Sequence, residues 1–169
     1  MKVMANTHFL QKKPKGALVI DILIASFFIV TALASFLVLA NLSLKASLSA
    51  NKEAEAKSLV QAAAEAVRNF RDNTDWQSNG LGTTTLGISY RLGKSPDSSY
   101  WILNPGEEQI KGFLRKIIFQ NARRDQDYNI VESGGSEDAD TKKVTIIISW
   151  QEKQQNHQLS LVTYFTNWH

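Results

Sequence analysis

The sequence has no cysteine and few residues that could carry catalysis or bind a metal. Without cysteine there is no disulfide framework, no lipid-bearing cysteine and no thiolate metal site. The three histidines, His8, His157 and His169, have no metal-ligand spacing. No phosphate-binding glycine loop or nucleophile elbow occurs, and Gly80-Leu81-Gly82 lacks the helix pattern that would follow such a loop. The sequence therefore predicts a protein that is not an enzyme and has neither a cofactor nor a metal.

Helix breakers are also missing from a long stretch. Residues 17–79 contain neither glycine nor proline, and within residues 17–44 the only formal charge is that of Asp21. At about 1.5 Å of rise per residue, a helix over 17–44 is about 42 Å long, which exceeds the roughly 30 Å hydrocarbon core of a bilayer. The stretch predicts a membrane-spanning helix. A carboxylate inside it is costly, so Asp21 is expected to have a function.

The apolar run passes into an amphipathic pattern with no breaker between them. Alanine, the best helix former, is frequent over residues 45–71. Steps of three or four define one face, formed by Leu48, Lys52, Glu55, Leu59, Ala63, Val67 and Phe70. We expect the same helix to continue to about Phe70. The alternative is a separate soluble helix joined through a hinge.

The net charge of +3 comes from the N-terminus. Residues 1–16 hold four of the 19 basic residues and none of the 16 acidic ones, so the remaining chain has a net charge of −1. Lys12, Lys13 and Lys15 directly precede the apolar run, and lysines in this position keep the N-terminus in the cytoplasm. The basicity therefore indicates membrane topology, and a nucleic-acid partner is disfavoured.

The second half of the chain has a β texture. Short stretches rich in β-branched and aromatic residues are separated by Gly, Pro, Asn and Asp, and strands are expected near residues 86–92, 100–103, 113–119, 128–131, 144–150 and 158–165. The last two are expected to pair around a polar loop, residues 151–157. Val144, Ile146, Ile148 and Trp150 share one strand face, and Trp76 is expected to anchor a loop onto the core.

These patterns predict an α+β protein in which a long N-terminal helix packs on an antiparallel sheet. The expected division is a cytoplasmic leader at 1–16, a membrane half of the helix at 17–44, an amphipathic half at 45–71 and a β-rich domain at 72–169.

Asp21 is the fifth residue after Gly16, and a short basic stretch precedes that glycine. In this the N-terminus resembles type IV prepilins and type II secretion pseudopilins. The resemblance implies cleavage between Gly16 and Ala17 by a prepilin peptidase, N-methylation of Ala17, and an assembly role for Asp21. It also implies a pilin-like fold and, as partners, other pilin subunits and the pilus assembly machinery. Pairing of Asp21 with the Ala17 amine of a neighbouring subunit would neutralise two buried charges and set the register.

The sequence departs from the usual family pattern in three ways, and the third of these, together with the absence of cysteine, indicates a minor pilin or pseudopilin within that family. Asp21 replaces the usual glutamate, Ala17 replaces the usual phenylalanine, and the helix lacks a central glycine or proline. The C-terminal part resembles minor pilin-like proteins in four segments, at residues 112–116, 137–141, 144–150 and 159–168. The implied location is the inner membrane, single-pass with the N-terminus inside, and then an extracellular or periplasmic filament.

Two clusters of charged residues, one acidic and one basic, are candidate binding sites. Glu132, Glu137, Asp138 and Asp140 could offer oxygens to Ca²⁺, but they lack calcium-loop spacing, and a solvated hairpin turn is the favoured interpretation. Arg115, Lys116, Arg123 and Arg124 lie near aromatic residues, as in a DNA-binding pilin, but salt bridges to the acidic turn explain these charges equally well.

Two alternative functions remain at this stage. The small-residue pattern at residues 31–35 could be cleaved by a general signal peptidase after Ala34, which would give a secreted soluble binding protein. The chain could also be a permanently membrane-anchored ectodomain, although that leaves Gly16 and Asp21 unexplained.

Overall fold

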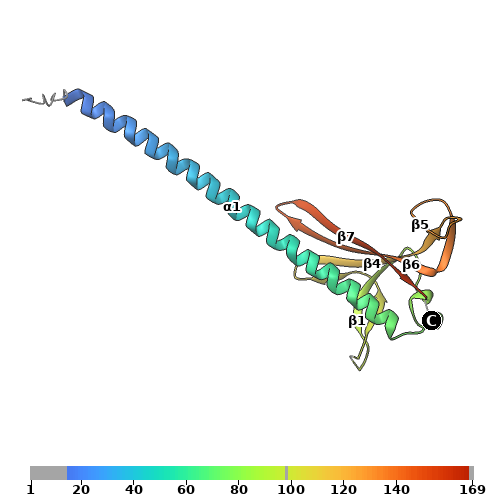
Figure 1. Cartoon of the computed structure of the whole chain (residues 1–169). Coiled ribbons are helices and arrows are strands. Elements are labelled where there is room, and N and C mark those ends of the chain that lie inside the picture. Colours follow the sequence, from blue (N-terminus) through green and yellow to red (C-terminus); the bar gives the residue numbers. More distant parts are fainter. Residues whose placement is uncertain (1–14, 98, 168–169) are drawn as a thin grey trace, which may run out of the picture. The chain divides into compact units, whose positions relative to one another are not determined.

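A computed structural model describes residues 15–97 and 99–167 of the chain. Helix α1 (Lys15–Asp72) runs without a break for 58 residues, so the predicted continuity is confirmed (Figure 1). A short 3-10 helix, η1 (Leu81–Thr83), precedes seven strands. These are β1 (Ser89–Lys94), β2 (Trp101–Pro105), β3 (Glu108–Ile110), β4 (Phe113–Arg124), β5 (Ile130–Val131), β6 (Ser136–Glu152) and β7 (Gln155–Thr166). The chain divides after Ala50 into two compact units.

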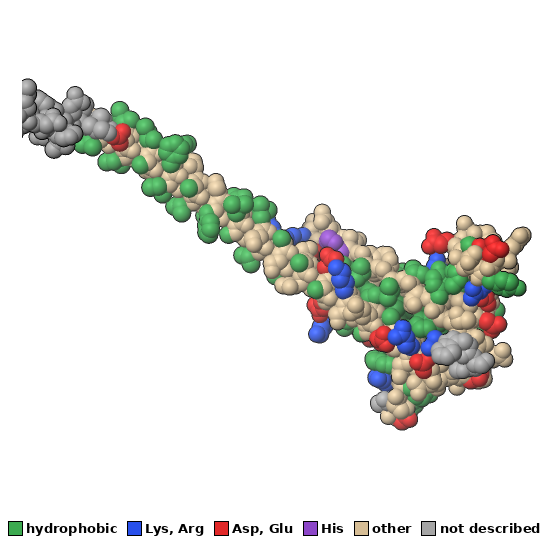
Figure 2. All heavy atoms as spheres, in the orientation of Figure 1, with side chains coloured by type: hydrophobic (Ala, Val, Ile, Leu, Met, Phe, Trp, Pro, Cys, Tyr) green, Lys and Arg blue, Asp and Glu red, His purple; other side chains and the backbone are tan. Residues whose placement is uncertain are grey.

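The first unit is the apolar part of α1. Every large apolar side chain from Leu18 to Leu44 is more than half exposed, and Figure 2 shows hydrophobic side chains along this part of the helix. The helix is long and apolar enough to cross a membrane, and none of its most apolar window is buried inside the protein. Apolar surface of this extent is disfavoured in water, so this half of α1 is compatible with a membrane-spanning helix.

In the second unit, β4 is the central strand of an antiparallel sheet with the order β2-β1-β4-β6-β7 (Figure 1). β6 pairs along one edge of β4, while β3, β1 and β5 pair at successive positions on the other edge. β6 bulges beside β4, where Asn121 pairs with Lys142 but Ala122 pairs with Asp138. The protein is therefore an α+β structure in which a long helix packs on an antiparallel sheet.

The core lies between the sheet and the C-terminal part of α1. The helix contributes one buried face, made of Ala56, Val60, Ala63, Ala66, Val67 and Phe70. Three of these six are alanines, whose small side chains allow the helix to approach the sheet closely. The sheet contributes larger side chains, among them Ile117, Phe119, Val144, Ile146 and Ile148, all fully buried. The predicted inward alternation of β6 and the predicted anchoring role of Trp76 are both confirmed.

The predicted helix face is correct only near its C-terminal end. Ala63, Val67 and Phe70 are buried, but Leu48, Lys52 and Glu55 are exposed. The buried stripe instead begins at Ala56, because burying the charges of Lys52 and Glu55 would cost more than burying a neighbouring alanine.

The predicted hairpin loop over residues 151–157 is wrong. β6 and β7 pair down to Glu152 and Gln155, so the turn contains only Lys153 and Gln154. Both have positive φ, 48° and 68°, the geometry of a type I′ hairpin turn. Neither is the glycine or asparagine that normally signals this turn, and the flanking residues are polar, so composition suggested a longer loop.

The acidic segment predicted as a turn also belongs largely to the sheet. Glu137 and Asp138 lie in β6 and pair with Arg123 and Ala122 of β4. Serine and acidic residues have low strand propensity, so pairing with β4 rather than local preference makes this segment extended.

Candidate functional site

The predicted processing and assembly residues lie at the start of α1, apart from Lys12 and Lys13, which fall outside the described residues. Lys15 is the first residue of α1, two positions before its predicted start, so Gly16 and Ala17 are in the first turn and Asp21 in the second. A side chain at Gly16 would meet no other atom within 4 Å. Backbone N–H groups of a first helical turn have no intrahelical acceptor, so the Gly16–Ala17 bond lies where the helix opens most easily.

Four polar side chains within the apolar half of α1, those of Ser26, Thr31, Ser35 and Asn41, form hydrogen bonds with the backbone of the helix itself. The Thr31 hydroxyl donates to the carbonyl oxygens of Phe27 and Phe28, both at 3.0 Å. The remaining bonds of this kind run from Ser26 to Leu23, from Ser35 to Thr31 and from Asn41 to Leu37, at 2.8 to 2.9 Å. A helix in hydrocarbon must pair its polar groups internally, and these residues meet that condition.

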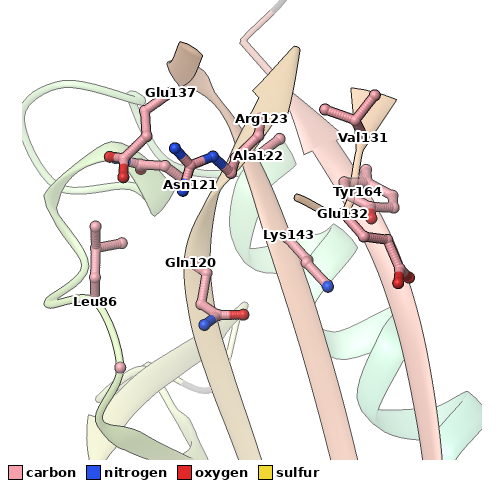
Figure 3. Close-up of a pocket in the computed structure, with 11 residues that line it drawn as sticks. Leu86, Gln120, Asn121, Ala122, Arg123, Val131, Glu132, Glu137, Lys143 and Tyr164 are labelled. Atoms are coloured by element: carbon pink, nitrogen blue, oxygen red, sulfur yellow. The ribbon is translucent and has the colours of Figure 1, made fainter. Parts of the chain in front are cut away.

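A polar hollow of about 380 Å³ lies on the sheet face opposite the core (Figure 3). Gln120, Lys143 and Tyr164 form a row across β4, β6 and β7, because they are directly opposite one another in the register. In the part of the chain that the structure describes, these three side chains form no hydrogen bond or ion pair. Leu86 closes one side of the hollow. The hollow thus offers amide, ammonium and phenol groups to a polar partner.

The four basic residues of β4 have separate partners. Arg124 donates to Asp138 at 2.6 Å and Arg123 donates to the carbonyl oxygen of Gly134 at 2.8 Å, so the predicted salt bridge to the acidic segment forms at Arg124. Arg115 and Lys116 instead pair with glutamates beside or within β3, Arg115 with Glu108 at 2.6 Å and Lys116 with Glu107 at 3.5 Å. Three of the four basic residues of β4 therefore form ion pairs within the sheet domain, and Arg123 bonds to a backbone carbonyl.

The acidic residues are not arranged as a metal site. Within residues 15–97 and 99–167, no group of three or more His, Asp or Glu side chains is placed to hold a metal ion. Burial raises the pKa of Asp138, but hydrogen bonds from Arg124 and Thr141 outweigh that effect and hold the pKa below its ordinary value. The Asp138 carboxylate therefore stays bound to Arg124 and Thr141.

A second set of polar residues, which the sequence reasoning missed, lies beside the bulge of β6. Lys142 is only 4% exposed, and its Nζ donates to Oδ1 of Asn121 at 2.6 Å. The Nδ2 group of Asn121 donates to Oε2 of Glu137 at 3.3 Å. The sequence does carry a signal for this, since extending the alternation of Val144 and Ile146 by one step places Lys142 on the core face.

The turn between β1 and β2 is ordered by a single carboxylate. Asp97 accepts hydrogen bonds from the hydroxyl groups of Ser95 and Ser99, at 2.6 and 2.7 Å, and from the Ser99 backbone N–H at 3.1 Å. These bonds, the one from Ser95 most strongly, lower the pKa of Asp97 from 3.8 to about 2.

Comparison of the chain with protein-family models, with curated proteins and with solved structures finds no match. Three features of the molecule bear on its function: the exposed apolar half of α1, the position of Asp21 near the start of α1, and the sheet domain that packs on the other half of α1.

Proposed function

We propose that this chain is a structural, non-enzymatic subunit of a bacterial type IV pilus or a related pseudopilus, of the minor pilin class. A prepilin peptidase cleaves it after Gly16, Ala17 becomes the methylated N-terminus, and the sheet domain is displayed outside the inner membrane. Lys12, Lys13 and Lys15 hold the leader in the cytoplasm before cleavage. The partners are other pilin subunits and the assembly machinery.

One observation carries this proposal: a single helix has two halves with opposite requirements. Its first half exposes every large apolar side chain, while its second half buries a narrow alanine-rich face on the sheet. A subunit that moves from lipid into a helical bundle needs this combination, because the apolar half must be covered in both places and the sheet domain must stay folded throughout. The polar hollow of the sheet is a candidate contact surface for neighbouring subunits.

After cleavage, Asp21 takes part in the assembly of subunits. It is the only formal charge within residues 17–44, and cleavage after Gly16 creates a cationic amine on Ala17 four residues before it. In a bundle, the carboxylate of one subunit pairs with the amine of the next, and two buried charges that pair cost far less than two left apart. The pairing fixes the axial register of the subunits.

The test is the intact mass and N-terminal sequence of the chain recovered from native membranes and from sheared surface filaments. We expect a chain that starts at Ala17 and is heavier by one methyl group, about 14 Da. A start at Ser35 would identify a secreted protein cleaved after Ala34, and a start at Met1 a permanent membrane anchor. Either of these results contradicts the proposal.

A Gly16→Leu variant provides a matched control for processing. Because a Cβ atom at this position has open space around it beyond the helix's own backbone, and leucine is a good helix former, the substitution should leave the helix intact. We expect the leader to be retained and the chain to remain in the membrane. Normal processing of this variant would argue against recognition of Gly16 by the peptidase.

A further inference from the structure

Asn121 and Lys142 occupy directly opposed positions on the neighbouring strands β4 and β6. They are the last register pair of β4 and β6 before the bulge, and both strands are held in place by pairing on either side of it. On the next strand, Phe165 of β7 pairs with Lys142 and is also buried. The two side chains are therefore fixed against each other by the sheet.

The amide of Asn121 is held between a donor and an acceptor. Nζ of Lys142 donates to Oδ1 at 2.6 Å and Nδ2 donates to the Glu137 carboxylate at 3.3 Å, so the amide oxygen faces Lys142 and the amide nitrogen faces Glu137. Because an amide C=O bond is about 1.23 Å long, Nζ lies within about 3.8 Å of the Asn121 carbonyl carbon Cγ. This approaches the separation of about 3 to 3.5 Å at which an attacking atom and its target react.

The surroundings of Lys142 make its charged form less favourable than that of an exposed lysine. Burial lowers the pKa of this group, while the carboxylates of Asp140 and Asp138 act in the opposite direction without reversing the shift. In the described part of the chain no carboxylate forms an ion pair with Nζ, whose hydrogen-bond acceptor is Asn121. An uncharged lysine amine is a nucleophile, and a desolvated site is where proteins commonly produce one.

We propose that Lys142 and Asn121 join in an intramolecular isopeptide bond, with Glu137 transferring the proton. Nζ of the uncharged amine attacks Cγ of Asn121 and forms the N–C bond. Nζ loses one proton to the Glu137 carboxylate, which passes it to Nδ2. The Cγ–Nδ2 bond then breaks, and Nδ2 leaves as ammonia. One amine and one primary amide thus yield one secondary amide and one ammonia, with no oxidant or reductant.

Such a bond would join two strands of this sheet covalently, as a disulfide does in proteins that contain cysteine. The chain has no cysteine, so no disulfide can hold its strands together. A link between residues 121 and 142 closes a covalent ring that contains β5 and the acidic start of β6, and it ties β4 to β6 beside the bulge. This inference does not depend on the proposed filament role.

The experiment is peptide mapping of the full chain by mass spectrometry under denaturing conditions. We expect the chain to be lighter by about 17 Da, the mass of ammonia, than its observed termini require. Trypsin does not cleave at an acylated lysine, so peptide 117–123 should be recovered covalently joined to peptide 125–143. Recovery of Asn121 and Lys142 in separate, unmodified peptides would overturn the proposal. So would a loss of about 17 Da confined to peptide 117–123, because cyclisation of Asn121 alone explains it.

Three variants separate the roles of the residues. Lys142→Arg and Asn121→Ala should each abolish the loss of about 17 Da and the joined peptide. The control Lys143→Arg, on the opposite sheet face, should still show the mass loss and the joined peptide. Glu137→Gln removes the proton carrier, and we expect the joined fraction to rise at least tenfold more slowly after synthesis. A Glu137→Gln chain that cross-links at the normal rate would refute the role of Glu137.

Discussion

Glu108 and Glu107 are adjacent glutamates whose ion pairs should differ sharply in strength. Glu108 binds Arg115, whose side chain is 6% exposed, through two nitrogen donors at 2.6 and 3.2 Å. Removing one partner of a fully buried pair costs about 3 to 5 kcal/mol, since the other charge stays buried and unpaired. Glu108 itself is 30% exposed, so water can partly replace it. We therefore expect Glu108→Ala to lower the free energy of unfolding by about 2 to 3 kcal/mol.

Glu107 provides the matched control. Its contact with Lys116 is 3.5 Å long, both side chains are about one-third exposed, and such pairs contribute about 0.5 kcal/mol or less. The assay is urea unfolding of the full chain in detergent micelles, followed by tryptophan fluorescence. With an m value of about 1.5 kcal/mol/M, Glu108→Ala should lower the midpoint by about 1.5 M and Glu107→Ala by less than about 0.4 M. Adding Arg115→Met to Glu108→Ala should recover most of the loss. Equal midpoints for the two alanine variants would refute the reasoning.

Three further predictions concern other parts of the chain. Asp21→Ala should reduce the sheared-filament fraction about tenfold or more relative to the membrane fraction on immunoblots, while the exposed-residue control Glu65→Ala should not; normal assembly of Asp21→Ala would contradict the register mechanism. Combining Lys153→Asn with Gln154→Gly supplies the residues that a type I′ turn prefers and should stabilise the sheet domain by about 1 kcal/mol in urea unfolding, whereas a loss of stability would exclude that turn geometry. The pKa of Asp97 is about 2 in the folded chain and 3.8 ordinarily, so its stabilisation is present above about pH 4 and is lost as the pH falls through 2. An NMR titration of its carboxyl carbon should show a midpoint near 2, and a midpoint near 3.8 would mean that the serine hydrogen bonds are not formed.

The parts of the fold that could be predicted from the sequence are those governed by local patterns. The absence of breakers between Gly16 and Gly80 predicted one helix, and the alternation from Val144 to Trp150 predicted a strand and its buried face. Both signals depend only on neighbouring residues. The buried face of the helix was harder to predict, because a spacing of three and four residues fits one face that includes Glu55 and another that includes Ala56. Only contact with the sheet determines which of these two faces is buried.

The sheet features that were missed depend on partners far along the chain. The start of β6 is extended because β4 lies beside it, and the short strand β3 exists because Glu108 faces Arg115. Lys142 and Asn121 are 21 positions apart and meet only through the β4–β6 register. No local pattern marks such a pair, although the strand period does place Lys142 on the core face.

The exposed apolar half of α1 also separates the pilin proposal from secretion. The side chains of α1 that build the core begin at Ala56, so cleavage after either Gly16 or Ala34 leaves the sheet domain complete. Cleavage after Ala34 would, however, leave seven large apolar side chains of α1 exposed in water, namely Phe36, Leu37, Val38, Leu39, Leu42, Leu44 and Leu48. A soluble protein rarely carries a contiguous patch of this kind without a partner to cover it. Cleavage after Gly16 would retain the whole apolar segment together with Asp21. Under the proposed function, a bundle of identical or related helices would cover the apolar segment and would supply a partner for the Asp21 carboxylate.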